Sequence, residues 1–417
     1  MNSYTGDYSP SPRPLSPSAR IKAAFILGSL SAFGPLSLDM YLPALPKLAE
    51  ELGTTASITQ LSLTSCLLGL ALGQLAAGPI SDVRGRRKPL IISLCLYALS
   101  SLLCVFAPTV WVLIALRFLQ GLSGAAGIVI SRAVVRDLYS GSELTKFFSL
   151  LMLVNGAAPI LAPIFGGQLL QFTSWRGVFV VLSLIGVVMM IAVLFGLPES
   201  LPKERRQSGG LTTTWATFRR LLGDRLFIGF CLTQGLVSSA MFAYISGSSF
   251  VMQNVFEVSP QMYSLIFAVN GIGIIIASQT TGRLAGRIKE ATMLQFGLAL
   301  ALAGALGLLA AILLGGKLIT VLIPLFLVVS CVGIISTSSF SLAMQSQGKA
   351  AGSASALLGL IPYILGATVA PLVGLGGEHT AVPMGIVIAI AELGAVSSYL
   401  LLVYPRIRAN STAAPQN

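Results

Sequence analysis

Charged residues are scarce in this sequence. They make up 10% of its 417 residues, whereas hydrophobic residues make up 55%. Soluble domains usually carry about 25% charged residues, because their surfaces must be hydrated. Together with a mean hydropathy of +0.86, this composition excludes an ordinary water-soluble protein and predicts a polytopic membrane protein.

Residues that build catalytic and metal sites are also few. The chain has one histidine, His379, and its five cysteines lie in apolar stretches without metal-ligand spacing. It has no clustered carboxylates that would hold Mg²⁺ for a membrane-embedded transferase. It has no GxxxxGK[ST] stretch that would bind ATP. We therefore predict that the protein is not an enzyme, needs no cofactor or metal, and draws on an ion gradient.

Long apolar stretches are what the chain does contain. Each has roughly 20 residues, the length that spans the hydrocarbon core of a bilayer. Helices are expected, because lipid offers the backbone no hydrogen-bond partner. The predicted fold class is an all-α membrane protein with twelve transmembrane helices, near 21–45, 57–80, 88–107, 109–131, 147–170, 176–197, 226–250, 260–281, 291–314, 318–342, 351–375 and 381–404.

The basic residues predict the orientation. With the N-terminal tail in the cytoplasm, 22 of the 26 lysines and arginines fall in the tails and cytoplasmic connections. Lys47, Arg176 and Lys317 fall outside, and Arg117 falls within a helix. The positive-inside rule then places both termini in the cytoplasm. The net charge of +12 thus reflects topology and not nucleic-acid binding. The tail has no apolar core, so no cleavable signal peptide is expected.

The longest polar interruption, residues 199–225, divides the twelve stretches into six and six. The connection GPISDVRGRRK from Gly78 has a related counterpart, GRLAGRIKE from Gly282, in the second half. Two related bundles with a site between them are typical of secondary transporters. We predict a disordered tail at 1–20, bundles at 21–198 and 226–404, and a tail at 405–417. The linker 199–225 is expected to hold an interfacial helix, built on Leu211, Trp215, Phe218 and Leu222.

The loop GPISDVRGRRKPL resembles the signature loop of the major facilitator superfamily. The matching residues are Gly78, Asp82, Gly85, Arg86 and Arg87. Val83 departs from the pattern, which prefers a cation there. The resemblance implies a conformational latch on the cytoplasmic side, and Asp137 is the nearest candidate partner for Arg86 or Arg87 by topology.

Two further stretches resemble motifs of the same superfamily. LRFLQGLSGAAG carries Arg117 and Gln120 on one helix face, and an intramembrane arginine is expected to face a cavity or an acid. NGAAPILAPIFGG resembles the fifth-helix antiporter motif, with Ala162 where glycine is usual. Small residues and prolines allow close packing and bending there. The motif residues are Pro159, Pro163, Gly166 and Gly167.

The stretch SLDMYLPALP places a carboxylate, Asp39, inside an apolar segment. With SRAVVRDL at 131–138, it resembles the Bcr/CflA group of bacterial drug:proton antiporters, of the bicyclomycin and chloramphenicol type. The resemblance implies that Asp39 carries the coupling proton and that Arg117 tunes it. From helix geometry alone, both lie roughly 9–12 Å below the outer membrane edge, so they can share a polar pocket. The alternative is a structural acid satisfied by neighbouring hydroxyl groups.

The substrate cavity is expected where amphipathic or large side chains fall on central helices. Aromatic rings, a methionine and one acid suit bulky apolar or weakly cationic compounds. A further buried acid, Glu392, is open between a packing role and a functional one. The cavity candidates are Tyr41, Gln120, Asn155, Met241, Tyr244, Asn270 and Tyr363.

The expected function is proton-coupled export of small hydrophobic or weakly cationic drugs and toxicants by alternating access, which would confer antibiotic resistance. The alternatives are a symporter or an exporter of a small metabolite with the same fold, and sodium in place of protons stays open. The expected partners are drug-like small molecules, protons and the lipid bilayer, without nucleic acid. We expect a monomer in the bacterial plasma membrane.

Overall fold

The structure is a computed structural model that describes residues 17–139, 141–206, 219–345, 347 and 351–413. Most of the predicted tail 1–20 lies outside these residues. Leu211, Trp215 and Phe218 of the predicted interfacial helix also lie outside them.

The described chain is helical throughout and contains one isolated β-bridge, between Ala285 and Ile288. The first half comprises α1 (Pro17–Ser31), α2 (Phe33–Asp39), η1 (Leu42–Ala44), α3 (Leu45–Glu51), α4 (Ala56–Arg84), α5 (Arg87–Val105), α6 (Val110–Leu138), α7 (Gly141–Leu169), α8 (Trp175–Gly196) and η2 (Lys203–Arg205). The second half comprises α10 (Arg225–Phe250), η3 (Val251–Val255), α11 (Pro260–Leu284), α12 (Glu290–Leu313), α13 (Leu318–Met344), α14 (Ala351–Val373), η5 (Gly374–Gly376), α15 (Val382–Ser398), η6 (Tyr399–Val403) and α16 (Tyr404–Ala413).

The predicted all-α membrane fold is confirmed. Among the described residues, 11 segments are long and apolar enough to cross a membrane. The twelfth is α7, a helix of 29 residues that contains the shorter apolar stretch Gly156–Leu169. Several helices are capped at their N-terminus by a side chain that accepts a hydrogen bond from a backbone N–H of the first turn. The capping residues are Thr55, Thr109, Ser174, Asp224 and Ser259.

The first span differs from the single helix expected over 21–45. It is divided into α1, α2, η1 and α3, and two prolines account for the divisions. A proline ring clashes with the carbonyl group four residues earlier. Pro35 therefore ends α1 at Ser31, and Pro43 ends α2 at Asp39. The second break leaves Asp39 as the last residue of a short helix inside the membrane.

The fourth span is longer than expected. The sequence predicts its end near residue 131, but α6 continues to Leu138. Arg132 and Arg136 therefore belong to the helix and not to the connection that follows it. Close packing holds α6 against α4, because a side chain at Gly121 would collide with the Cys66 carbonyl group and one at Gly69 with the Phe118 carbonyl group.

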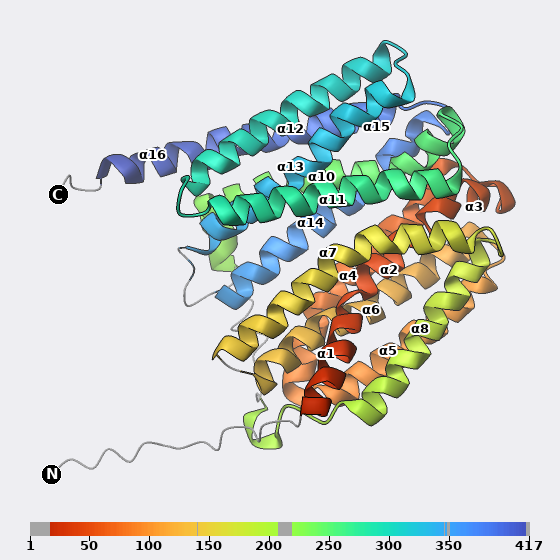
Figure 1. Cartoon of the computed structure of the whole chain (residues 1–417), viewed down its shortest axis with the longest axis vertical. Coiled ribbons are helices and arrows are strands. Elements are labelled where there is room, and N and C mark those ends of the chain that lie inside the picture. Colours follow the sequence, from red (N-terminus) through yellow and green to blue (C-terminus); the bar gives the residue numbers. More distant parts are fainter. Residues whose placement is uncertain (1–16, 140, 207–218, 346, 348–350, 414–417) are drawn as a thin grey trace.

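The two halves of the chain form two groups of helices (Figure 1). Helices α1–α8, coloured red to yellow-green, lie in the lower part of the view, and α10–α16, coloured green to blue, lie in the upper part. Contacts between the groups come mainly from α14 packing on α4 and from α11 packing on α7. The site described below lies along this boundary.

Hydrogen bonds between the halves gather at one end of the molecule, which we call the joined end. It contains the start of α4 and α11 and the last turns of α7, α10 and α14. Among the described residues, no hydrogen bond links the halves at the opposite end. The side-chain donors and backbone acceptors are Ser57 with Pro371 (3.0 Å), Gln60 with Ser246 (3.0 Å), Thr64 with Ala367 (3.2 Å), Ser249 with Leu42 (2.5 Å), Gln253 with Pro43 (3.1 Å) and Gln261 with Gly167 (3.0 Å).

Candidate functional site

Arg117 is the largest charged group buried in the first half. Its guanidinium carbon lies 4.4 Å from the ring centre of Tyr41 and 5.6 Å from that of Phe179, so both rings stabilise the cation. It donates a hydrogen bond to Gln120, whose amide donates to Ser101 Oγ at 2.7 Å. The Nε and Nη2 atoms of Arg117 have no hydrogen-bond partner among the described residues. Arg117 is therefore held mainly by aromatic rings.

Asp39 is also buried, with 5% of its surface exposed. Within the described part of the chain, its carboxyl group forms no ion pair or hydrogen bond. The structure thus does not bring Asp39 and Arg117 into contact. The turn after α2 directs Tyr41 onto Arg117 instead. The two charged groups still share a neighbour, because both lie within electrostatic range of the Cys66 thiol.

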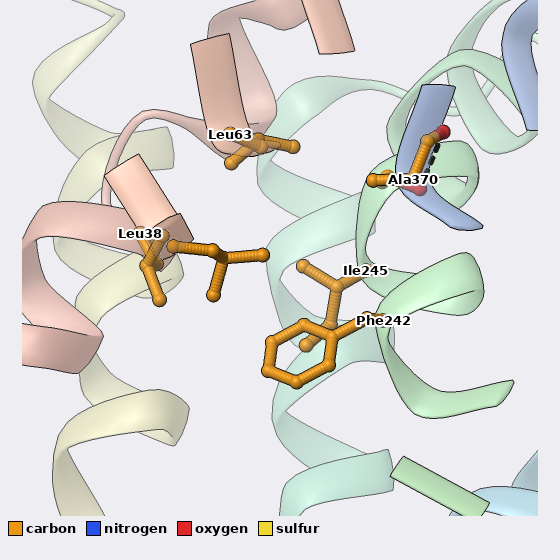
Figure 2. Close-up of a pocket in the computed structure, with 7 residues that line it drawn as sticks. Leu38, Leu63, Phe242, Ile245 and Ala370 are labelled. Carbon is orange, nitrogen blue, oxygen red and sulfur yellow. Dashed lines mark hydrogen bonds between the residues drawn. The ribbon is translucent and has the colours of Figure 1, made fainter. Parts of the chain in front are cut away.

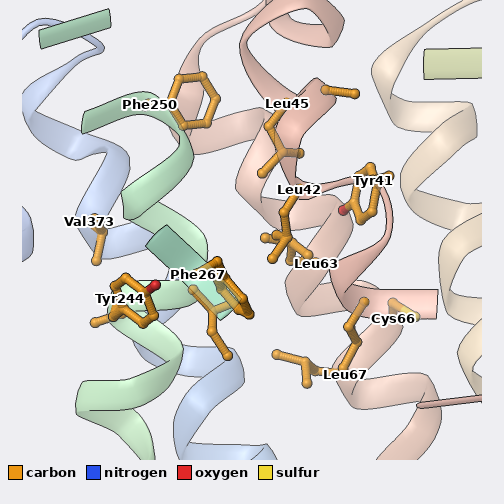
Figure 3. Packing of buried hydrophobic residues seen from close by; sticks show 14 of the residues in the cluster. Tyr41, Leu42, Leu45, Leu63, Cys66, Leu67, Tyr244, Phe250, Phe267 and Val373 are labelled. Atoms are coloured by element: carbon orange, nitrogen blue, oxygen red, sulfur yellow. The ribbon is translucent and has the colours of Figure 1, made fainter. Parts of the chain in front are cut away.

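The second half faces Asp39 with aromatic side chains. Asp39 lies within electrostatic range of the hydroxyl groups of Tyr244, Tyr263 and Tyr363. Tyr244 accepts a hydrogen bond of 2.9 Å from Asn270 Nδ2 and stacks on Phe267, with ring centres 5.4 Å apart. Figure 3 shows Tyr244 and Phe267 on one side of the boundary and Tyr41, Leu63 and Cys66 on the other.

A small pocket lies on this boundary (Figure 2). Residue Leu38, next to Asp39, forms part of its wall, and all its other lining side chains but one are apolar. Such a surface suits an apolar ligand more than a sugar or a dicarboxylate. The lining residues are Leu38, Leu63, Leu67, Phe242, Ile245, Ser246 and Ala370.

The structure distributes the predicted cavity residues around this boundary. Tyr41 and Gln120 are buried in the first half, and Tyr41 exchanges a hydrogen bond of 2.9 Å with Ser62. Met241 and Tyr363 pack at the edge of the large central core. Asn155 belongs to α7, but its side chain lies outside the described residues. Sequence reasoning missed the apolar lining residues, because nothing distinguishes a lining leucine from the many leucines that pack helices.

The predicted loop motif forms a compact polar cluster in the first half. Arg86 contacts Asp82 at 2.5 Å and Asp137 at 2.9 Å, so Arg86 and not Arg87 is the partner of Asp137. Arg87 instead donates to the Leu194 carbonyl group. Burial disfavours the charge of Arg86, but its hydrogen bonds to Asp137 and Asp82 outweigh burial and raise its pKa above the ordinary value. The guanidinium stays charged.

Glu199 completes the cluster, although the sequence motif does not include it. Its carboxylate accepts the backbone N–H of Arg86 at 2.7 Å and that of Arg87 at 3.2 Å. Gly85 makes the turn possible with a φ of 87°, a conformation that favours glycine. A side chain there would also meet Glu199. The cluster therefore ties the ends of α4, α5 and α6 to the segment after α8.

We expect the Asp82→Asn variant to transport more slowly and to bind substrate with unchanged affinity. The change removes a charge from the cluster that fixes four chain segments, but it leaves the boundary pocket intact. Transport rates in vesicles and binding to the purified protein separate the two effects. Glu204→Gln, which neutralises an exposed acid nearby, is the matched control. A normal transport rate in Asp82→Asn would reduce the loop to a topology signal.

The fifth-helix motif packs at the joined end. Pro159 and Pro163 lie within α7, which continues through both. A side chain at Gly166 would collide with the Met40 carbonyl group, next to Asp39. One at Gly167 would collide with the hydroxyl group of Ser264 in the second half. These glycines allow α7 to approach both the broken first span and α11.

Glu392 is wholly buried in the second half. Neither carboxyl oxygen has a hydrogen-bond partner among the described residues. The Cys331 thiol lies within electrostatic range of Glu392. Glu392 does not line the boundary pocket, so we expect no role for it in transport, and an unpaired buried polar group destabilises the fold.

We expect the Glu392→Leu variant to be more stable to unfolding by about 1–3 kcal/mol, because it removes an unsatisfied buried group. Transport should be unchanged. Thermal unfolding in detergent and vesicle transport measure the two properties, with the exposed Glu50→Leu as a control that should alter neither. Loss of transport in Glu392→Leu alone would instead give this carboxyl group a functional role.

Comparison with known proteins agrees with this geometry. The family model described as Major Facilitator Superfamily matches residues 27–371. An uncharacterized MFS-type transporter, YdgK, from Bacillus subtilis is 45% identical over 394 residues, which cover 94% of this chain and 98% of the relative. A bicyclomycin resistance protein homolog from Haemophilus influenzae is 31% identical over 385 residues, covering 91% and 97%.

Solved structures show the same fold. A bacterial homolog of the human lysosomal transporter Spinster, in an inward-facing and unoccupied conformation, superposes with a TM-score of 0.71 at 15% identity. The match covers 93% of this chain and 95% of that one.

Proposed function

From its membership of the major facilitator superfamily, we propose that the chain exports small hydrophobic or weakly cationic compounds in exchange for protons. Its similarity to a bicyclomycin resistance protein homolog supports this proposal. It is a multi-pass membrane transporter and not an enzyme. Its bacterial relatives indicate the plasma membrane.

The observation that carries the proposal is the unpaired carboxyl group of Asp39 at the boundary between the halves, directly after Leu38, which lines the boundary pocket. Burial of an ionised carboxylate without a partner is expensive, and the C-terminal end of α2 offers a negative charge no compensation. Asp39 is therefore stable when it holds a proton, or when water or a cationic ligand accompanies its charge. A proton and a cationic substrate then compete for one group, and each must weaken the binding of the other. Such competition is the basis of exchange.

Alternating access follows from the asymmetry of the contacts between the halves. With both termini in the cytoplasm, the joined end faces outward, so we assign this structure to a state open toward the cytoplasm. Opening outward must break the hydrogen bonds of the joined end. The polar cluster around Arg86 stays within the first half, and we propose that it acts as the latch of the opposite state.

The orientation can be tested by labelling introduced cysteines with a membrane-impermeant thiol reagent. We expect a cysteine at Gly210, in the linker outside the described residues, to react only in everted vesicles. A cysteine at the exposed Lys317, in the connection between α12 and α13, should react only in intact cells. Each cysteine is introduced into a variant in which serine replaces Cys95, because Cys95 is exposed and could itself react. The reverse pattern would overturn the assignment of the joined end.

Everted vesicles with an imposed proton gradient test the function. Chloramphenicol or a cationic dye is added to the outside, and a pH-sensitive dye reports the gradient. An exporter that exchanges protons should release protons from the vesicles when substrate is added. A symporter would carry protons inward with the substrate and so deepen the gradient. Omission of sodium should leave the response unchanged, and a response that depends on sodium would reject proton coupling.

A further inference from the structure

Arg132 is a charged residue that the proposed mechanism does not use. It lies inside α6, six residues before the end of the helix at Leu138, and is partly buried. Its Nε atom is buried without a hydrogen-bond partner, and its side chain forms no ion pair with a described residue. A charged residue of this kind within a membrane span is costly unless it faces water, an acid or a ligand.

The side chain with the strongest electrostatic effect on Arg132 belongs to the other half of the protein. The hydroxyl group of Tyr363 in α14 lies within electrostatic range of Arg132. The exposed Arg136, one turn farther along α6, adds positive charge to the same surroundings. Arg132 in the first half therefore lies near a residue of the second half, at the boundary between the halves.

Tyr363 also connects this region with the pocket. Its ring packs on Phe242, with centres 5.9 Å apart, and Phe242 lines the boundary pocket. Asp39 is itself within electrostatic range of Tyr363. The boundary thus carries an acid at one position, an arginine at another, and apolar and aromatic side chains between them.

We propose that Arg132 and Tyr363 form a second subsite, which binds a carboxylate or another strong hydrogen-bond acceptor on the transported compound. The inference rests on the proposed export function and extends its substrate class from apolar and cationic compounds to zwitterionic ones. A guanidinium presents a planar set of donors that fits a carboxylate in a bidentate manner. The tyrosine hydroxyl supplies a further donor. A zwitterion can then pair its cationic part with Asp39 and its carboxylate with Arg132.

A matched pair of dyes tests the subsite. Tetramethylrhodamine is a zwitterion with a free carboxylate, and its methyl ester is a cation with the same rings. Their binding to the purified full-length protein is followed by fluorescence polarisation. We expect Arg132→Gln to weaken binding of the free acid about tenfold or more, as for the loss of a charge-assisted hydrogen bond, with little effect on the ester. Tyr363→Phe should weaken binding of the free acid to a smaller extent.

The controls separate recognition from structure. Arg136→Gln removes an equal charge one turn away and should change the affinity of neither dye strongly. Arg132→Lys should retain part of the preference for the free acid over the ester. If Arg132→Gln does not fold, the loss of preference in Arg132→Lys is the measurement that tests the subsite. Equal losses for the acid and the ester, or no loss for either, would overturn the subsite.

The outcome for the subsite is distinguishable from that for export. If the wild type exports the ester against a gradient but has no preference for the acid that depends on Arg132, export stands and the subsite fails. If the preference depends on Arg132 but neither dye moves protons in vesicles, the subsite stands and proton-coupled export fails.

Discussion

Uphill export should be lost in the Asp39→Asn variant, although the protein still folds and still binds neutral compounds. Asparagine fills the same space but cannot alternate between a charged and a neutral form. The competition between proton and substrate therefore disappears, while the apolar pocket formed by residues such as Leu63 and Phe242 remains. Vesicles should show no substrate-driven proton movement, yet exchange of a neutral substrate down its own gradient should persist.

The matched control is Glu50→Gln, which neutralises an exposed acid later in the same span and should transport normally. If Asp39→Asn drives export at the wild-type rate, the carboxyl group is structural. The coupling proton would then have to be carried elsewhere.

The second large effect is expected at Gly166. In Gly166→Ala, the new methyl group collides with the Met40 carbonyl group, and both atoms belong to backbone or Cβ positions that cannot rotate away. Overpacking of this kind costs about 1–3 kcal/mol. It displaces the chain just before η1, where the Leu42 and Pro43 carbonyl groups accept hydrogen bonds from the second half, and so weakens the joined end. We expect the population of the state with the joined end intact, and with it transport, to fall about tenfold or more.

The same substitution at Gly156 is the control for Gly166→Ala. A Cβ there would lie 3.6 Å from Ile275 Cδ1, which is ordinary contact, so Gly156→Ala should transport normally. The accessibility of a cysteine placed at the joined end measures the state populations directly. Wild-type transport in Gly166→Ala would show that the close approach to Met40 is not needed in any step.

The sequence predicts the membrane fold well, because the length of an apolar stretch and the position of charges are local properties. It does not predict the division of the first span, although the two prolines that cause it are visible. Hydropathy averages over Pro35 and Pro43, whereas the backbone breaks four residues before each. The apolar stretch ends near residue 131, whereas α6 continues through Arg132 and Arg136 to Leu138, so hydropathy places the end of this helix too early.

Prediction of the site is more uneven. Asp39 and Arg117 stand out because charged residues are rare in membrane spans. Their relation depends on how the chain turns after α2, which places Tyr41 and not Asp39 on the guanidinium. The loop cluster was predicted as far as its motif extends, and Glu199 was missed because it joins the cluster from the end of a distant helix. Apolar lining residues carry no sequence signal of their own.

The central claim is that proton and substrate compete for Asp39. It is tested most directly by adding the cationic methyl ester of tetramethylrhodamine to purified protein in weakly buffered solution and measuring the protons released. The wild type should release protons in proportion to bound dye, at a pH where the unliganded carboxyl group is protonated, and Asp39→Asn should bind the dye without release. Equal proton release by the wild type and Asp39→Asn, or binding to the wild type with no release at any pH, would contradict the account.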